Sequence, residues 1–248
     1  MSALPENIPS TSDLTDAELI AYELESKKAG ERIAWLYETY GARVVASSSF
    51  GLQAAVMLHL ISKHAPKIPV VFVDTGYLFP ETYKYIEQLR EQLNVDIRFY
   101  QPKLTAAHQE AIYGKLWEQG DEGMQQYALL NKVEPMSRAL EDIGGDIWLS
   151  GVRRSQSKTR ADRGFAEQQK ATIKAYPILD WADAQVASYY YENNLPKHPL
   201  EAEGFVTMGD WHSTVPLTEG MTAEETRYGG QKYECGLHLE SSTNDFQI

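Results

Sequence analysis

Short apolar, β-branched runs alternate with segments of helical periodicity along most of this chain, and this alternation limits the possible folds more than any other feature. Strands separated by helices typically form a parallel sheet that is covered on both faces. The runs lie at 43–47, 69–73, 95–100, 146–151 and 173–177. The sequence therefore predicts an α/β fold with an open, mainly parallel sheet of five or six strands and helices on both faces.

Helical periodicity covers five stretches between and around these runs. The pattern over 16–40 fits one or two helices, and Pro80 is well placed in the first turn of a helix that extends to about Leu93. The other stretches are 52–64, 136–143 and 183–193. We expect a flexible N-terminus over 1–15, one α/β domain over 16–194, and an irregular C-terminal segment over 195–248 that closes over the domain.

Composition excludes several classes of protein. The net charge of −12 over 248 residues opposes nucleic-acid binding through a broad basic face. No apolar run is long enough to span a membrane, no signal peptide is visible, and a single cysteine favours a reducing compartment. We expect a cytoplasmic protein without a nucleic-acid or membrane partner. An anionic ligand would have to meet the one basic cluster, formed by Arg153, Arg154, Lys158, Arg160 and Arg163.

Cys235 is the only cysteine, and it follows Glu234 and precedes Gly236. A lone cysteine forms no intramolecular disulfide and cannot hold a thiolate zinc or iron–sulfur site by itself. It is either a buried apolar filler, the commoner fate of a free cysteine, or a chemically used thiol. Its position in a polar stretch beyond the last periodic segment favours the reactive thiol.

Three predicted strands end in loops that suit ligand binding, which in open parallel sheets occurs beyond the carboxyl ends of the strands. The loop Ser47–Gln53 is rich in hydroxyl groups and leads into a helix, where backbone N–H groups and the helix dipole favour an anion. Serines that merely cap the helix are an equal alternative. The loop has neither a Walker A nor a G-x-G-x-x-G pattern.

The other two loops follow the second and fourth strands. Asp74 and Thr75 could bind a sugar or base beside Gly76, although an Asx turn would explain the same residues. In the loop 150–157, Arg153 and Arg154 could clamp a phosphate, although a solvated basic turn is the common alternative. All three loops are expected at one edge of the sheet.

The order of these motifs resembles the 3′-phosphoadenylyl sulfate (PAPS) reductase family from about Arg43 to His238. The motifs are Ser-Ser-Ser-Phe-Gly, Asp-Thr-Gly-Tyr-Leu-Phe-Pro-Glu-Thr-Tyr, Lys-Val-Glu-Pro-Met (132–136), Gly-Val-Arg-Arg-Ser-Gln-Ser and Glu-Cys-Gly-Leu-His. The resemblance implies an adenine nucleotide α-hydrolase fold, in which 16–194 binds the nucleotide and 195–248 carries the catalytic Cys235. It further implies PAPS as substrate, thioredoxin or glutaredoxin as electron donor, no bound cofactor, and a homodimer.

The expected reaction begins with attack of the Cys235 thiolate on the sulfate sulfur, which gives an S-sulfonate and releases adenosine 3′,5′-bisphosphate. An outside thiol then releases sulfite, because the chain has no second cysteine. The resemblance assigns the serine loop to the phosphosulfate, Asp74–Gly76 and Gly151 to adenosine, and several cations to anionic groups or the thiolate. The substrate-binding residues expected are Ser47, Ser48, Ser49, Gly51, Gln53, Asp74, Thr75, Gly76, Lys132, Gly151, Arg153, Arg154, Ser157, Arg227 and His238.

A sister family, the adenylyl sulfate (APS) reductases, carries a [4Fe–4S] cluster on four cysteines. Here the corresponding residues are Tyr127, Ala128, Asp210 and Ser213, so the chain resembles the branch without an iron–sulfur cluster. Three alternatives remain open. They are an APS reductase without a cluster, a non-catalytic nucleotide-binding regulator, and a pyrophosphatase-loop ligase or sulfate adenylyltransferase subunit. The last would typically show Ser-Gly-Gly-x-Asp-Ser, whereas this loop continues Ser-Phe-Gly-Leu-Gln.

Overall fold

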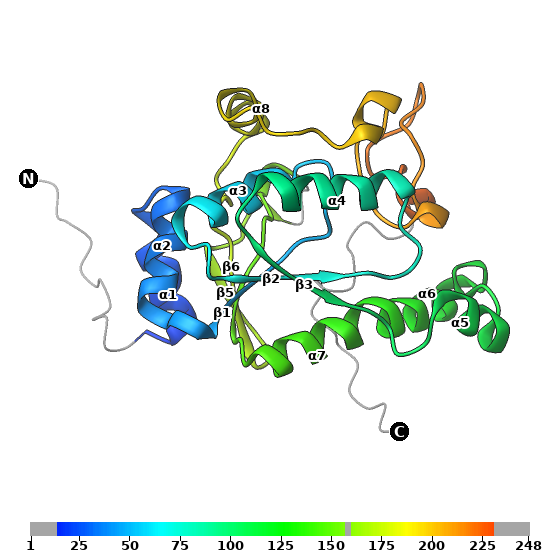
Figure 1. Ribbon diagram of the computed structural model, residues 1–248, viewed down its shortest axis with the longest axis horizontal. Coiled ribbons are helices and arrows are strands. Elements are labelled where there is room, and N and C mark those ends of the chain that lie inside the picture. The colour runs from blue at the N-terminus through cyan, green and yellow to red at the C-terminus, as the bar shows by residue number, and fades with distance from the viewer. Residues whose placement is uncertain (1–13, 157–159, 231–248) are drawn as a thin grey trace, which may run out of the picture.

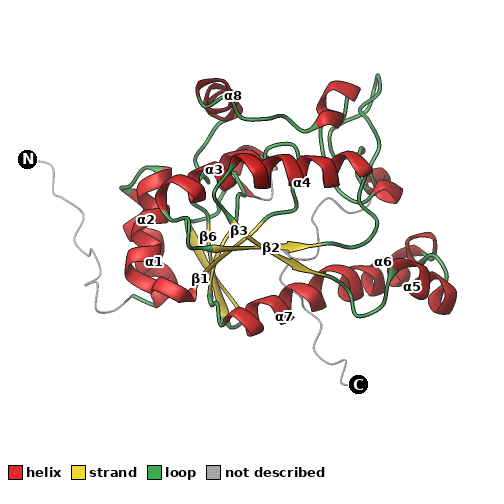
Figure 2. Cartoon of the chain, viewed as in Figure 1, coloured by secondary structure: helices red, strands yellow, loops and turns green. Residues whose placement is uncertain are grey.

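The computed structural model describes residues 14–156 and 160–230, and a six-stranded sheet forms its centre (Figures 1 and 2). The strand order is β3-β2-β1-β4-β6-β5. All neighbouring pairs are parallel except β5 and β6, which are antiparallel. This confirms the predicted open, mainly parallel sheet. The strands are β1 (Val44–Ser47), β2 (Pro69–Val73), β3 (Asp96–Tyr100), β4 (Ile147–Leu149), β5 (Ala166–Gln169) and β6 (Thr172–Ala175).

Each end of the predicted runs lies within two residues of the corresponding end of β1, β2, β3, β4 or β6. β5 was not among them, because its sequence Ala-Glu-Gln-Gln has no β-branched or aromatic residue. It is an edge strand that pairs only with β6, its immediate successor in the chain. Tertiary pairing, rather than local propensity, therefore determines this strand.

Helices cover both faces of the sheet, as predicted (Figure 1). Alternate residues of β1 face opposite ways: Val44 and Ala46 belong to the larger core with α3 and α4, whereas Val45 packs with Val71 and Trp148 under α7. The helices are α1 (Asp16–Glu25), α2 (Ala29–Tyr40), α3 (Ala54–His64), α4 (Pro80–Gln92), α5 (Ala106–Tyr113), α6 (Gly120–Ala128), α7 (Glu134–Ile143) and α8 (Asp183–Glu192).

The segment 16–40 forms two helices rather than one. Thr15 caps α1 through a capping box with Glu18, and the backbone N–H of Lys28 bonds to Glu31 at the start of α2. Buried Arg32 of α2 then donates to the carbonyl of Leu24 and to the carboxylate of Asp180. The two helices are thus tied to each other and to the segment that follows β6.

A π-helical turn, Leu129–Val133, joins α6 to α7 without a break. The wider turn carries Asn131 and Lys132, both buried, and π turns of this kind are frequent at functional sites. Sequence periodicity indicated helices on either side of this turn but not the turn itself.

Beyond α8, the described chain to residue 230 contains 3₁₀ turns at Pro199–Glu203, Trp211–Ser213 and Tyr228–Gly230. Isolated bridges pair Leu78 with Asp210 and Thr214 with Arg227, so this segment folds back beside the end of β2. The proposed domain boundary near residue 195 stays a prediction. In 14–156 and 160–230, no helix has the length and apolar content needed to cross a bilayer.

Candidate functional site

The three loops singled out in the sequence follow β2, β1 and β4, which are neighbours in the sheet. Because these strands are parallel, their carboxyl ends lie at the same edge, as predicted. From β1 the chain passes to β2, which lies on one side of β1 in the sheet, and it later reaches β4, which lies on the other side of β1. The site therefore lies at a topological switch point, where open α/β sheets bind their ligands.

The loop from Ser47 to Gln53 presents polar side chains in front of α3. The hydroxyl oxygen of Ser47 accepts a hydrogen bond of 2.7 Å from Nε1 of Trp148, and that of Ser48 accepts one of 3.1 Å from the Phe50 backbone N–H. Gln53 occupies the N-cap of α3 but makes no side-chain capping bond, and the first turn carries no acidic residue. The serines therefore do not serve as the side-chain cap of α3, and the positive end of its dipole lies behind this loop.

Arg153 is only 2% exposed, and its guanidinium bonds within the protein. It donates to Oε1 of Gln53 over 2.6 Å and pairs with the Asp183 carboxylate over 2.8 Å. Further bonds go to the Trp181 carbonyl and the Ser155 hydroxyl. The structure thus places Arg153 behind the loop, joined to Gln53, rather than open to a ligand.

Arg154 likewise bonds to protein groups, because both Nε and Nη2 donate to the carbonyl of Arg163. Its guanidinium also lies over the Phe165 ring, 5.3 Å from the centroid. Gly151 is required for close packing, since a Cβ there would lie 2.9 Å from Cγ of Met57. Ser157, Lys158, Cys235 and His238 lie outside the described residues, and their expected roles stay predictions.

At the end of β2, Asp74 forms an Asx turn, the alternative to ligand binding that the sequence analysis named for this residue. Its Oδ1 accepts from the Gly76 backbone N–H over 2.9 Å and from the Tyr83 hydroxyl over 2.7 Å. Its Oδ2 accepts from the Gln101 amide. Gly76 has φ +77°, a conformation that side chains with a Cβ rarely adopt. The turn fixes the conformation of the loop, and the expected ligand role of Asp74–Gly76 stays a prediction.

Thr75 and Lys132 meet at a residue that sequence analysis did not single out as functional, Asp210. The Thr75 hydroxyl donates to Oδ1 of Asp210 over 2.5 Å, and Nζ of Lys132 lies 2.6 Å from Oδ2. Lys132 also donates to the hydroxyl of Tyr228 over 3.2 Å. Although burial alone would raise it, the charge and hydrogen bonds of Lys132 and Thr75 lower the pKa of Asp210. This buried ion pair joins the β2 loop, the π turn and the C-terminal segment.

Rings from four segments surround this ion pair. His212 stacks on Trp117 with centroids 4.1 Å apart and an interplanar angle of 9°, and it lies edge-on to Tyr77 and Tyr127. Burial lowers the pKa of His212 to about 4, so the imidazole is neutral at pH 7. Tyr127 also meets the segment that contains Asp210 and Ser213, so three of the positions expected to correspond to cluster cysteines of the sister family come together here. Among the residues at 14–156 and 160–230, no group of three or more His, Cys, Asp or Glu is arranged to hold a metal ion.

Arg227 lies beside the serine loop through its contact with Met208. Its Nη1 donates to the Met208 carbonyl over 2.6 Å, and Met208 approaches Gly51, whose added Cβ would lie 3.7 Å from the Met208 Cβ. The guanidinium fills the space beside Gly209, where an added Cβ would collide with it. The structure therefore brings Arg227 to the same edge of the sheet as Ser47–Gln53.

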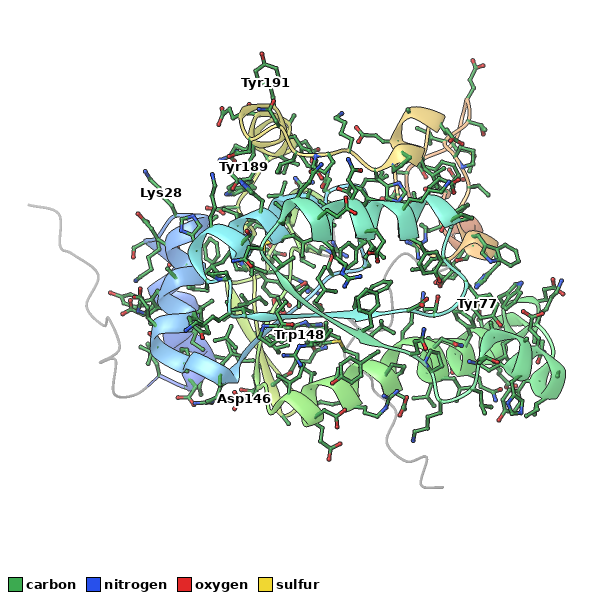
Figure 3. All side chains as sticks on the ribbon, in the orientation of Figure 1. Lys28, Tyr77, Asp146, Trp148, Tyr189 and Tyr191 are labelled. Atoms are coloured by element: carbon green, nitrogen blue, oxygen red, sulfur yellow. The ribbon has the colours of Figure 1, made fainter. Side chains whose placement is uncertain are left out.

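Sequence reasoning missed Asp210, Trp148 and His212 as members of this site. Asp210 was noted only because it is not a cysteine, and no spacing pattern links it to Lys132. The signal that could have identified Trp148 is its place in the fourth strand, where it pairs with Val45, two residues before Ser47. Its side chain lies on the face of the sheet that α7 covers (Figure 3).

Comparison with known proteins agrees with this geometry. The family described as phosphoadenosine phosphosulfate reductase domain matches residues 43–216. The phosphoadenosine 5′-phosphosulfate reductase of Photobacterium profundum is 48% identical over 223 residues, which cover 90% of this chain and 88% of that protein. The protein of the same name from Xylella fastidiosa is 46% identical over 231 residues, covering 93% of this chain and 98% of that protein.

Solved structures show the same relationship. The crystal structure of phosphoadenylyl-sulfate (PAPS) reductase from Candida auris, a phosphate complex, has a TM-score of 0.71 and 30% identity, and the match covers 82% of this chain and 98% of that chain. The FMN adenylyltransferase of Candida glabrata, with a TM-score of 0.56 and 16% identity over 84% of this chain and 78% of that one, shows the shared adenine nucleotide α-hydrolase-like fold alone. The chain belongs to the phosphoadenosine phosphosulfate reductase family.

Proposed function

We propose that this protein reduces PAPS to sulfite and adenosine 3′,5′-bisphosphate, with Cys235 as nucleophile and thioredoxin or glutaredoxin as electron donor. The observation that carries the proposal is the anchoring of the C-terminal segment at the ligand edge, through the contacts of Asp210 and Tyr228 with Lys132. Cys235 lies seven positions after Tyr228. Such a stretch spans at most about 25 Å, and this short tether supports the proposal that Cys235 acts at the strand-end loops.

The proposed reaction has two steps. The Cys235 thiolate attacks the sulfate sulfur, a sulfur–sulfur bond forms, and the sulfur–oxygen bond to the 5′-phosphate breaks, leaving its electron pair on the nucleotide. A donor thiolate then attacks the Cys235 sulfur and displaces sulfite, which takes the electron pair and is thereby reduced. A second thiol of the donor resolves the mixed disulfide, because Cys235 is the only cysteine in the chain.

The described loops support a division of labour for substrate binding. Ser47–Gln53, in front of the α3 N-terminus, suits the phosphosulfate, and the β2 loop with Gly151 suits the adenosine. Arg227 is the described cation beside the serine loop that fits a negative group, together with the backbone N–H groups of that loop. We further propose a homodimer acting in the cytoplasm; the family relationship supports these assignments.

The test is sulfite release from PAPS and from APS, each with reduced thioredoxin, by the wild type and by Cys235→Ser. We expect the wild type to release sulfite from PAPS with a kcat/KM far above that for APS, and the variant to release none while still binding PAPS. A preference for APS would instead indicate an APS reductase without a cluster. Binding of PAPS without any turnover by the wild type would support a nucleotide-binding regulator.

A further inference from the structure

Two side chains of the proposed phosphosulfate loop receive hydrogen bonds from buried residues behind the loop. Nε1 of Trp148 donates to Oγ of Ser47 over 2.7 Å, and Nη2 of Arg153 donates to Oε1 of Gln53 over 2.6 Å. Indole and guanidinium N–H groups donate hydrogen bonds and accept none. In both contacts the loop residue is therefore the acceptor.

The direction of these hydrogen bonds determines which donors and acceptors the loop presents to a ligand. Because the amide oxygen of Gln53 is bonded to Arg153, its two N–H hydrogens are turned away from Arg153. Because the Ser47 oxygen accepts from Trp148, its own O–H is left to donate, and accepting a bond strengthens that donor. Ser48 shares this arrangement, since its oxygen accepts from the Phe50 backbone N–H. The loop thus presents hydrogen donors, which suit an anion.

Both buried residues are themselves held in place. Arg153 is 2% exposed and is also bonded to Asp183 and to the Trp181 carbonyl. Trp148 is 5% exposed, and Nζ of Lys174 lies over its ring, 3.9 Å from the centroid. A cation over the indole face makes the ring N–H a stronger donor. Neither Trp148 nor Arg153 needs to touch the substrate to influence its binding.

We propose that Trp148 and Arg153 are positioning residues that make Ser47 and Gln53 hydrogen donors to the charged group of the substrate. The loop then binds an anion with neutral side chains, although the protein carries a net charge of −12 and the loop has no lysine. The ligand class is a phosphosulfate or the isosteric diphosphate. The inference rests on the proposed function for its assignment of this loop to the anion.

A double-mutant cycle tests the link between Trp148 and Ser47. Trp148→Phe, Ser47→Ala and the double variant are made on a Cys235→Ser background, which blocks turnover, and titration calorimetry gives Kd for PAPS and for ADP. Trp148→Phe keeps an aromatic ring and removes the N–H together with the second ring of the indole, so the unfolding curves also report the effect of the lost buried volume. We expect each single change to weaken binding about tenfold, the loss of one hydrogen bond to a charged group.

The double variant distinguishes positioning from packing. If Trp148 acts through Ser47, Trp148→Phe adds nothing to the loss caused by Ser47→Ala. If the two losses multiply to about a hundredfold, Trp148 acts independently and the inference is wrong. Unfolding curves for all four proteins identify any variant that fails to fold, in which case the Gln53 variant below decides.

Gln53→Glu tests the Arg153 contact at an exposed position of the loop. Glutamate keeps an acceptor for Arg153 but has no donor, so we expect Kd for PAPS and ADP to rise more than tenfold. Gln92→Glu, which adds the same charge at the far end of α4, is the matched control and should leave both Kd values unchanged. Unchanged binding by Gln53→Glu would contradict the inference.

The two nucleotides separate this inference from the proposed function. One outcome is that the wild type releases no sulfite from PAPS while Trp148→Phe adds nothing to the loss of ADP affinity caused by Ser47→Ala. In that case the proposed function is wrong and the inference stands. If PAPS is turned over but the losses of affinity in the two single variants multiply in the double variant, the inference alone is wrong. A protein that binds neither nucleotide contradicts both.

Discussion

Lys132 and Asp210 form a buried ion pair, with Nζ and Oδ2 2.6 Å apart and side chains that are 10% and 1% exposed. The two residues lie 78 positions apart in the chain, one in a π turn and the other in the irregular C-terminal segment. Thr75 bonds to the other oxygen of the carboxylate, so the pair also includes the loop after β2. A single contact therefore holds three parts of the proposed site together.

We predict that Asp210→Asn lowers the free energy of unfolding by about 3–5 kcal/mol, because it leaves the Lys132 ammonium buried without its counter-charge. Urea denaturation at pH 7 measures the change. The matched control is Glu201→Gln, which breaks the largely exposed pair with Lys197 and should change stability by no more than about 0.5 kcal/mol. A loss no larger than that of the control would show that the buried pair does not stabilise the fold.

The pKa of Asp210 is lowered in the folded protein, so its contribution to stability is fully present above the pKa of an unfolded aspartate, about 3.9. That contribution is lost as the pH falls below this value through the folded pKa. The wild type should therefore lose stability below about pH 4 more steeply than Asp210→Asn. Unfolding free energies between pH 2 and 5 test this difference, and parallel curves for the two proteins would contradict it.

His212 predicts a separate effect at higher pH. Burial lowers its folded pKa from 6.5 to about 4, so the unfolded chain binds more protons than the folded one between these values. Stability is complete above pH 6.5 and falls as the pH approaches 4. His212→Phe keeps a ring on Trp117 and should flatten the profile across this window. Thermal unfolding between pH 4 and 7.5 provides the measurement, and an unchanged slope would exclude His212 as its source.

Gly209→Ala tests the proposed role of Arg227 without changing that residue. The new methyl group would collide with the guanidinium, the far end of a flexible side chain, and would displace it from its place beside Met208. We expect kcat/KM for PAPS to fall about tenfold to a hundredfold, the value of a hydrogen bond to a charged group. Gly164→Ala, whose Cβ would make only an ordinary contact of 3.5 Å, should retain full activity. Equal activity of the two variants would contradict a role for Arg227.

The sheet and most helices could be predicted from the sequence, because buried parallel strands such as Pro69–Val73 are short apolar runs bounded by turn residues. The shared edge of the three loops followed from parallel strand direction alone. β5 could not be predicted, because its own residues have low strand propensity and the strand forms through its pairing with β6. The division of 16–40 into two helices depends on capping at Lys28 that periodicity does not reveal.

The polar contacts of the site were less predictable than its location. Arg153 and Arg154 were expected to clamp a phosphate, yet their guanidinium groups bond to Gln53 and to the Arg163 carbonyl. Lys132 was expected to meet an anion, and its partner in the structure is Asp210. A sequence shows which residues carry charge, but the choice among several partners depends on burial and on distances between segments that only the fold determines.

The central claim is that Cys235 carries the sulfonate during turnover, and mass spectrometry tests it most directly. The protein is mixed with PAPS without any reductant, digested and compared with an untreated sample. We predict one sulfonate on the peptide that contains Cys235, which disappears on addition of reduced thioredoxin as sulfite is released. An unmodified Cys235 in a preparation that releases sulfite when thioredoxin is present, or sulfite release by Cys235→Ser, would contradict the account.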